Sequence, residues 1–373
     1  MKKNELIHQG VLPDTCILNF IENGWIKNAQ ISCTQPASID VFPDLNDIFE
    51  VDIFSSPKKG EKISDMIIEL YNQDLARKLK NPILIQGKKY MIRLREKLCE
   101  LPFYARMNPK SSPGRLFLHS RMLTDGSYIY DEVYPNQQGG DHWLMLSPKC
   151  FSIELTDNEP LSQLRFFKGS DRLSSKNLER EMKRYSFIRS TKNPELFTEE
   201  DARVPVVGSD IASNLLTVDM ESDIVAYSTK KFYEPILLSS RDIDPKKYFD
   251  FIYRDELSPN GLLLIQGVGY LLGSSELIKL PGHLASEVVP FSEKYGELRS
   301  HYAGYIDPGF GLDTPCGNSI TFEVISHESG ISLRHRQPIA EIQYEYMSKD
   351  PKTLYKGNYK NQTSGPKLPK YFK

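Results

Sequence analysis

The 373-residue sequence predicts a mainly β protein built from two copies of one barrel-like domain, with few short helices. Two observations lead to this fold class. Most segments are short, alternate apolar and polar residues, and are broken by Pro, Gly, Asn or Asp, which is typical of barrels and sandwiches. The second half of the chain also repeats short motifs of the first half in the same order, as expected after a duplication.

The repeat is clearest in the motif Leu-Ile-Gln-Gly, which is followed by a Tyr. Residues 84–87 and Tyr90 recur as residues 264–267 and Tyr270, in both cases 180 positions later. We therefore expect an N-terminal domain over residues 1–170, a charged connection over 171–205 and a C-terminal domain over 206–373. Two weaker matches support the duplication: Leu101-Pro102 with Leu280-Pro281, and Pro160-Leu161-x-Gln163-Leu164 with Pro338-Ile339-x-Glu341-Ile342.

The individual elements follow from local patterns. Alternating apolar segments predict strands in both halves, and three short segments are expected to be helical. The last of these helices has Ser174 and Ser175 as N-cap candidates and belongs to the connection. The tail from Ser348 is rich in Lys, Pro, Gly and Asn, so we expect it to be loop-like or conditionally ordered. The predicted strands are 41–53, 83–94, 143–155, 161–167, 261–270, 319–325 and 339–346, and the predicted helices are 13–23, 63–78 and 175–185.

Composition narrows the class of protein. The formal net charge is −2 and the sequence pI is about 6.4, so no bulk basic field favours nucleic acid. The sequence has no run of about 18 apolar residues and no apolar region of a signal peptide, so we expect no membrane partner and a cytoplasmic location. The five cysteines are odd in number and scattered, which is typical of reduced thiols.

The sequence HYAGYIDPGFG (301–311) and the strand after it carry the first candidate site. Ala303 and Gly304 leave room for a flat ligand near the backbone, and a Pro-Gly pair reverses the chain just after Asp307. Glu323 lies in the middle of the next strand, where a carboxylate is unusual. It is either on a solvated strand face or a catalytic carboxylate facing a pocket beside the hairpin.

The second candidate site is the turn over residues 108–115. Ser111 and Ser112 provide adjacent hydroxyl groups between the positive charges of Lys110 and Arg115. Phosphate oxygens favour such a set of hydroxyl, turn N–H and cationic donors. The alternative is an ordinary polar turn.

Together these motifs resemble the dCTP deaminase and dUTPase superfamily, and in particular the two-domain dCTP deaminases. YAGYIDPGFG followed by FEV is similar to the family's pyrimidine-pocket hairpin and catalytic-Glu strand. Lys-Ser-Ser-x-x-Arg resembles its Arg-Ser-Ser-x-x-Arg phosphate grip, although Lys110 lacks the bidentate fork of Arg. Residues 35–41 resemble its opening strand motif, whose role is structural. The segment with Tyr359, Lys360 and Gln362 resembles its C-terminal lid, which folds over bound nucleotide; the alternative is a disordered basic end.

This resemblance implies a dUTPase-like (β-clip) distorted barrel in each half and conversion of dCTP to dUTP and ammonia for pyrimidine deoxynucleotide synthesis. It implies Glu323 as the catalytic residue, Mg²⁺ bound with the triphosphate, and a homo-oligomer with sites between domains or subunits. Zinc is not expected, because the sequence lacks the His-x-Glu and Pro-Cys-x-x-Cys motifs of zinc deaminases. The implied substrate-binding residues are Lys110, Ser111, Ser112, Arg115, Ala303, Gly304, Asp307, Tyr359, Lys360 and Gln362, with no metal ligand.

The two halves have not kept the same motifs. Opposite the Lys-Ser-Ser turn the second half has the acidic, aromatic segment 290–296, and near the position of Glu323 the first half has Met145. We therefore expect a composite site, with the phosphate turn from one half and the hairpin and Glu323 from the other.

Three different functions remain compatible with these motifs. The hairpin resembles that of dUTPases as much as that of deaminases, so a dUTPase or a bifunctional deaminase–diphosphatase is possible; Glu323 favours the deaminase. In a dUTPase the residue equivalent to Asp307 orients water and contacts the sugar; the alternative here is that Asp307 merely fixes the hairpin. The second function is that of a non-catalytic nucleotide-binding regulator, and the third is that of a structural β protein.

Overall fold

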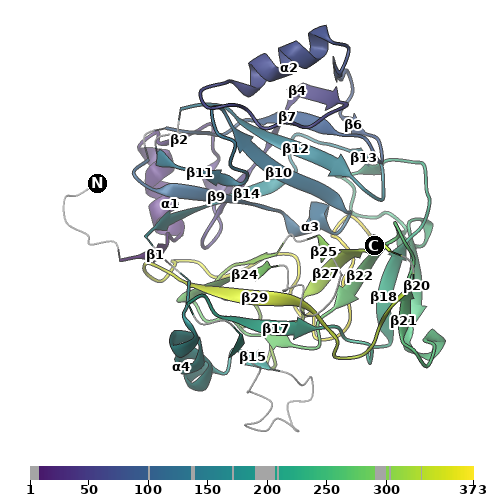
Figure 1. Cartoon of the computed structure of the whole chain (residues 1–373). Coiled ribbons are helices and arrows are strands. Elements are labelled where there is room, and N and C mark those ends of the chain that lie inside the picture. Colours follow the sequence, from purple (N-terminus) through teal and green to yellow (C-terminus); the bar gives the residue numbers. More distant parts are fainter. Residues whose placement is uncertain are drawn as a thin grey trace.

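The computed structural model describes residues 8–99, 101–135, 139–169, 172–189, 206–207, 210–289, 300–301, 304–328 and 330–373 (Figure 1). It is mainly β, and the strands of the two halves of the chain form two similar groups of sheets that lie one above the other in Figure 1. The predicted fold class is confirmed. The described part of the chain contains four α-helices: α1 (Asp14–Glu22), α2 (Ile63–Asn72), α3 (Ser111–Gly114) and α4 (Ser175–Tyr185).

The first half contributes β1 (Gly10–Val11), β2 (Ile26–Lys27), β3 (Ile39–Val41), β4 (Pro43–Val51), β5 (Ala76–Lys78), β6 (Ile83–Leu84), β7 (Tyr90–Leu94), β8 (Lys97–Leu98), β9 (Tyr104–Pro109), β10 (Leu118–Thr124), β11 (Glu132–Val133), β12 (His142–Pro148), β13 (Ile153–Glu154) and β14 (Ser162–Lys168). One five-stranded sheet has the order β1–β14–β9–β11, with β3 also paired to β14. The other has the order β10–β12–β7–β4–β5.

The second half contributes β15 (Ile188–Arg189), β16 (Val206–Val207), β17 (Ser213–Thr217), β18 (Ile224–Thr229), β19 (Ile236–Leu237), β20 (Phe249–Tyr253), β21 (Leu262–Leu264), β22 (Gly269–Gly273), β23 (Leu277–Ile278), β24 (Leu284–Val289), β25 (Ser300–His301), β26 (Tyr305–Ile306), β27 (Thr321–Ile325), β28 (Ile331–Leu333) and β29 (Pro338–Tyr346). Its two five-stranded sheets have the orders β16–β17–β29–β24–β26 and β20–β18–β22–β27–β25. The halves also share the small sheet β19–β13–β6.

Turns divide several segments that the sequence predicts as continuous. The predicted helix 63–78 is wrong beyond Asn72, because Asp74 takes a left-handed conformation (φ 58°) and the next residues form β5, paired with β4. The predicted strands 83–94 and 261–270 are each two strands, separated by a turn at Gly87 (φ 78°) and Gly267 (φ 75°). Positive φ values of this kind favour glycine.

The other segments keep their predicted type. The helices 13–23 and 175–185 are confirmed as α1 and α4, and the strands 161–167, 319–325 and 339–346 as β14, β27 and β29, within two residues at each end. The segments 41–53 and 143–155 contain strands but are interrupted, by the β3–β4 and β12–β13 boundaries.

The repeated motif makes the same contacts in both halves. The Tyr90 hydroxyl accepts a hydrogen bond from the backbone N–H of Ile85 at 2.7 Å, and the Tyr270 hydroxyl accepts one from Ile265 at 3.0 Å. The strand registers extend this equivalence. In the first half Met145 is paired with Met91, and in the second Glu323 is paired with Leu271, which lies 180 positions after Met91. Met145 thus occupies the position of Glu323, as the sequence suggested.

One face of the second half packs on the first half. Tyr227 and Leu271 belong to the same buried cluster as Phe117 and Phe151 of the first half. The approach is close at Gly269, where a Cβ atom would lie 2.8 Å from the Phe117 ring and from Cys150 Sγ. A residue with a side chain would force the halves apart here, so glycine sets this spacing.

The equivalent face of the first half is covered differently. Ile63 and Ile67 of α2 pack against Met91, Trp143 and Met145. Helix α2 is inserted between β4 and β5 and covers this face of the first half (Figure 1). In the second half, the equivalent face packs against the first half instead.

Candidate active site

A pocket lies between the two halves of the chain. It encloses about 610 Å³ of empty space, counting the part open to solvent. Five segments form it: the two ends of α3 from the first half, β24, the hairpin, β27 with the two residues before it, and the C-terminal tail. Its lining residues are Ser111, Arg115, Val288, Gly304, Tyr305, Ile306, Phe310, Ser319, Ile320, Thr321, Phe322, Glu323, Tyr355 and Tyr359.

The phosphate turn is fixed at the end of β9. Ser111 lines the pocket, whereas Ser112 is buried and its hydroxyl lies 2.6 Å from the hydroxyl of Tyr359. Arg115 is 5% exposed; its Nη1 donates to the carbonyl oxygen of Lys367 at 2.8 Å, and its guanidinium lies 3.5 Å from the centre of the Tyr359 ring. Its Nε–H is buried and has no hydrogen-bond partner among the described residues. A buried cationic donor without an acceptor suits an anionic ligand.

Lys110 does not line the pocket. Its ammonium group lies 2.7 Å from a carboxylate oxygen of Asp40, a residue of the opening strand motif. Burial opposes the charge of the ammonium, but Asp40 outweighs this effect and the pKa of Lys110 is raised. The positive charge of Lys110 is therefore already balanced within the protein.

The hairpin approaches β24 through Gly304. A Cβ atom on this residue would lie 2.8 Å from the Val288 Cβ and 2.9 Å from its carbonyl oxygen, so the backbones meet only because position 304 is a glycine. The Gly304 carbonyl also accepts a hydrogen bond from the Val288 N–H at 2.7 Å. Ala303 lies outside the described residues.

Asp307 is not among the residues that line the pocket, and it contacts the first half. It is 6% exposed and accepts a hydrogen bond from the backbone N–H of Ala37, beside Asp40 and Lys110. Burial raises the pKa of Asp307 to about 6; the charge of Lys110 opposes this shift and the charge of Asp40 adds to it. Asp307 thus ties the hairpin to the opening strand motif.

Glu323 lines the pocket from the middle of β27. Its side chain is 4% exposed, and its backbone is paired with Leu271 on β22 and with His301 on β25. Thr321 lies on the same face of the strand and accepts a hydrogen bond from Gln362 Nε2 at 2.8 Å. The carboxylate is therefore almost removed from solvent on a strand that has neighbours on both sides, which is a suitable position for acid–base chemistry.

The C-terminal tail lies across the pocket and has no regular secondary structure apart from an isolated bridge at Phe372. Tyr359 lines the pocket, Gln362 is buried against β27, and the exposed Lys360 is outside the lining. Both ends of this segment are held by buried carboxylates of the first half. Asp14 accepts hydrogen bonds from the backbone of residues 352 and 353, and Glu159 binds Lys370 and Tyr371.

Some lining residues were not among the sequence candidates. Tyr355 and Phe310 have ring centres 5.2 Å apart and form an aromatic wall, and Val288 lies on β24, far from the motifs in sequence. Tyr305 and Phe310 belong to the hairpin motif, and their aromatic character was a usable signal. Val288 carried no signal that distinguishes it from core residues.

Two structural findings concern metals and membranes. Within the described ranges, no group of three or more His, Cys, Asp or Glu side chains could hold a metal ion. Among the helices described here, none is long and apolar enough to span a membrane.

Comparison with known proteins gives one consistent result. The family model for the N-terminal domain of 2'-deoxycytidine 5'-triphosphate deaminase matches residues 8–170, and the model for its C-terminal domain matches residues 186–372. The structure is similar to the crystal structure of 2'-deoxycytidine 5'-triphosphate deaminase from Agrobacterium tumefaciens, with a TM-score of 0.78 and 26% sequence identity over 92% of this chain and 100% of that chain. No curated protein matches the chain in sequence. The chain therefore belongs to the 2'-deoxycytidine 5'-triphosphate deaminase family.

Proposed function

We propose that this enzyme deaminates dCTP to dUTP and ammonia without zinc, in the pocket between its two halves. One observation carries the proposal: Ser111 and Arg115 from the first half line the same pocket as Glu323 from the second. Cationic and hydroxyl donors for phosphate and a buried carboxylate for proton transfer thus lie at one site. Family membership supports the reaction, and the absence of the zinc-deaminase sequence motifs supports the zinc-free route.

In this mechanism Glu323 acts first as a base and then as an acid. Its carboxylate takes a proton from a water molecule, and the water oxygen bonds to the ring carbon that bears the amino group. The same proton then passes to the ring nitrogen, and a second transfer through Glu323 to the amino group lets ammonia leave as the carbonyl forms. Such proton transfer contributes roughly 10²- to 10⁴-fold in rate, and positioning and electrostatics supply the rest.

The hairpin is the proposed site for the pyrimidine. Gly304 leaves its backbone accessible beside the pocket, while Tyr305 and Phe310 provide apolar surface for a flat ring. We assign Ala303 to the same role because of the family motif. Asp307 supports the hairpin from behind through Ala37.

The triphosphate is assigned to Ser111, Ser112 and Arg115. Tyr359 now contacts Ser112 and Arg115, so binding of the phosphates requires this side chain to move aside. In the bound state Tyr359, Lys360 and Gln362 are proposed to cover the nucleotide, with the exposed Lys360 adding charge. We assign Lys110 a supporting electrostatic role, because Asp40 already balances its charge. Mg²⁺ enters with the substrate, held by the triphosphate oxygens.

We place the reaction in the cytoplasmic supply of dUTP for pyrimidine deoxynucleotide synthesis, and we expect a homo-oligomer from the family resemblance.

The test is incubation of the purified protein with dCTP and with dUTP, with ammonia and pyrophosphate measured separately. Release of ammonia from dCTP without release of pyrophosphate from dUTP supports the deaminase. Release of pyrophosphate from dUTP would identify a dUTPase or a bifunctional enzyme. If neither product forms and nucleotide still binds, the protein is a non-catalytic regulator.

A further inference from the structure

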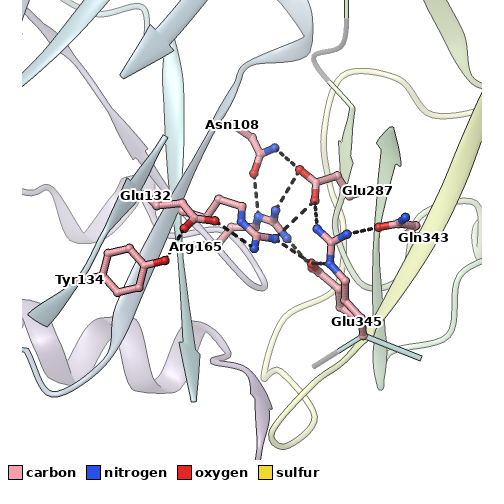
Figure 2. A network of polar contacts seen from close by, with 9 residues as sticks. Asn108, Glu132, Tyr134, Arg165, Glu287, Gln343 and Glu345 are labelled. Carbon is pink, nitrogen blue, oxygen red and sulfur yellow. Dashed lines mark hydrogen bonds and ion pairs between the residues drawn. The ribbon is translucent and has the colours of Figure 1, made fainter. Parts of the chain in front are cut away.

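The two halves meet through a buried cluster of charged residues. Figure 2 shows these side chains between the ribbons of the two halves, with Asn108 and Arg165 toward the first half and Glu287 and Glu345 toward the second. We call this group the interface cluster. It contains Arg106, Arg165 and Asn108 of the first half, Arg172 of the connection, and Glu287 and Glu345 of the second half.

The ion pairs of the interface cluster cross between the halves. Glu287 lies 3.2 Å from Arg165, 3.6 Å from Arg106 and 3.2 Å from Arg172. Asn108 donates to Glu287 at 2.7 Å and accepts from Arg165 Nε at 2.8 Å. The interfacial carboxylates of the second half are thus surrounded by donors that come from the first half and the connection.

The strand registers show that two of these residues occupy the same position of the duplicated domain. The Pro160 and Pro338 motifs align Arg165 with Gln343. Arg106 is paired with Arg165 across the β9–β14 ladder, and Glu287 is paired with Gln343 across the β24–β29 ladder. Arg106 and Glu287 are therefore equivalent residues of opposite charge, and they contact each other at 3.6 Å.

Because these side chains are buried, the sign of each charge determines whether the contact between two surfaces is favourable. The side chains of Arg165 and Glu345 are both 0% exposed, and that of Glu287 is 12% exposed. Burial alone would raise the pKa of Glu287, but Arg165 and Arg106 outweigh it and hold the pKa below its ordinary value. Ion pairs in such places add little net stability against apolar residues, whereas an unpaired or like-charged group is strongly unfavourable. The main effect of such buried ion pairs is to determine which surface can pack against this one.

We propose that the interface cluster is a charge-coded contact surface that accepts only the unlike half of this protein. Two first halves would bring Arg106 against Arg106, and two second halves would bring Glu287 against Glu287. The partner that fits the cationic face of the first half is the acidic face of a second half, from the same chain or exchanged from another copy. The two halves therefore cannot form like-with-like pairs through this surface. Because the candidate pocket needs both halves, this selection also decides whether the pocket forms.

Charge reversal at the equivalent pair tests the proposal in the full-length protein. Glu287→Arg imitates two first halves at this position, and Arg106→Glu imitates two second halves. The neutral variants Glu287→Gln and Arg106→Gln remove the attraction without adding repulsion. Thermal unfolding temperature and yield of monodisperse protein are measured for each variant and for the double reversal Arg106→Glu/Glu287→Arg. Reversal of Lys230, which is paired with Asp250 at 3.3 Å inside the second half, is the matched control, because the two side chains are 40% and 64% exposed.

We expect each single reversal to lower the unfolding temperature more than its neutral variant, and the double reversal to recover part of the loss by restoring the attraction between positions 106 and 287. Recovery should be only partial, because position 287 also faces Arg165 and Arg172, at 3.2 Å each. Position 106 likewise faces Glu132 and Glu345, at 3.4 and 3.5 Å. The control reversal should have a small effect, because exposed ion pairs contribute little. If the single reversals yield no folded protein, recovery of folded protein by the double reversal gives the same support. Reversals no worse than the neutral variants, or a double reversal no better than the single ones, would overturn the proposal.

Discussion

Arg115→Ala should weaken binding of dCTP much more than binding of deoxycytidine, which has no phosphate groups. Loss of one charge-assisted hydrogen bond to phosphate costs about 1.5–3 kcal/mol, or roughly 10- to 150-fold in affinity. In the free protein Arg115 stacks on Tyr359 at 3.5 Å and donates to the Lys367 carbonyl, and these contacts must be exchanged for phosphate. A buried cation–π contact is worth about 2 kcal/mol, and its loss on binding offsets part of what Arg115 gains from phosphate. We therefore expect the Ala variant to lose about 10- to 50-fold in affinity for dCTP, the lower part of the range above.

The assay is isothermal titration with dCTP and with deoxycytidine, in the presence of Mg²⁺ and in a Glu323→Gln background that prevents turnover. Arg115→Lys retains the charge without the fork and should lie between the wild type and the Ala variant. Arg334→Ala, at an exposed position outside the pocket lining, is the control for loss of a surface charge. An equal loss of affinity for dCTP and deoxycytidine would refute the assignment of Arg115 to phosphate.

Three further predictions concern the chemistry and the stability. Glu323→Gln should keep dCTP binding and abolish ammonia release, because the amide keeps the shape but cannot take a proton; turnover above a few per cent of wild type would exclude Glu323 as the base. Treatment with EDTA followed by excess Mg²⁺ should restore full activity, whereas stoichiometric zinc in the active protein would exclude the zinc-free mechanism. The raised pKa of Asp307, about 6, means that its contribution to stability is present below pH 4 and is lost as the pH rises through 6. Asp307→Asn, which can still accept from Ala37, should therefore gain unfolding free energy relative to wild type as the pH rises from 4.5 to 7, by up to about 2 kcal/mol, with a matching gain in unfolding temperature; a constant difference would contradict this.

Local sequence patterns predicted the parts of the structure that depend on local physics. Alternation of apolar residues located most strands. The turn, the hairpin with its following strand, and the C-terminal segment supplied the candidates Arg115, Gly304, Glu323 and Tyr359, which all line one pocket. The error in the helix 63–78 arose because its end depends on pairing of β5 with β4, a tertiary contact that overrides helical preference.

The sequence could not assign the charged residues around the site. Lys110 is placed beside the phosphate turn in sequence, but its ammonium contacts Asp40, which is 70 residues away in the chain. Asp307 likewise contacts Ala37. Whether a charge faces a ligand or another charge depends on which distant strands meet, and one sequence without pairing information does not contain that choice.

The difference between the two halves explains why the candidate site is composite. Met145 and Glu323 occupy equivalent strand positions, but the face around Met145 is closed by Ile63 and Ile67 of helix α2. The face around Glu323 is instead held against the first half, at a distance set by Gly269, and this brings the carboxylate to the pocket that Arg115 also lines. A carboxylate at position 145 would therefore be buried among apolar side chains with no phosphate turn beside it, which is a strongly unfavourable environment. Duplication thus gave each half an equivalent sheet face. In the described part of the chain, helix α2 covers the face of the first half, whereas the packing of the two halves brings the face of the second half to the phosphate turn.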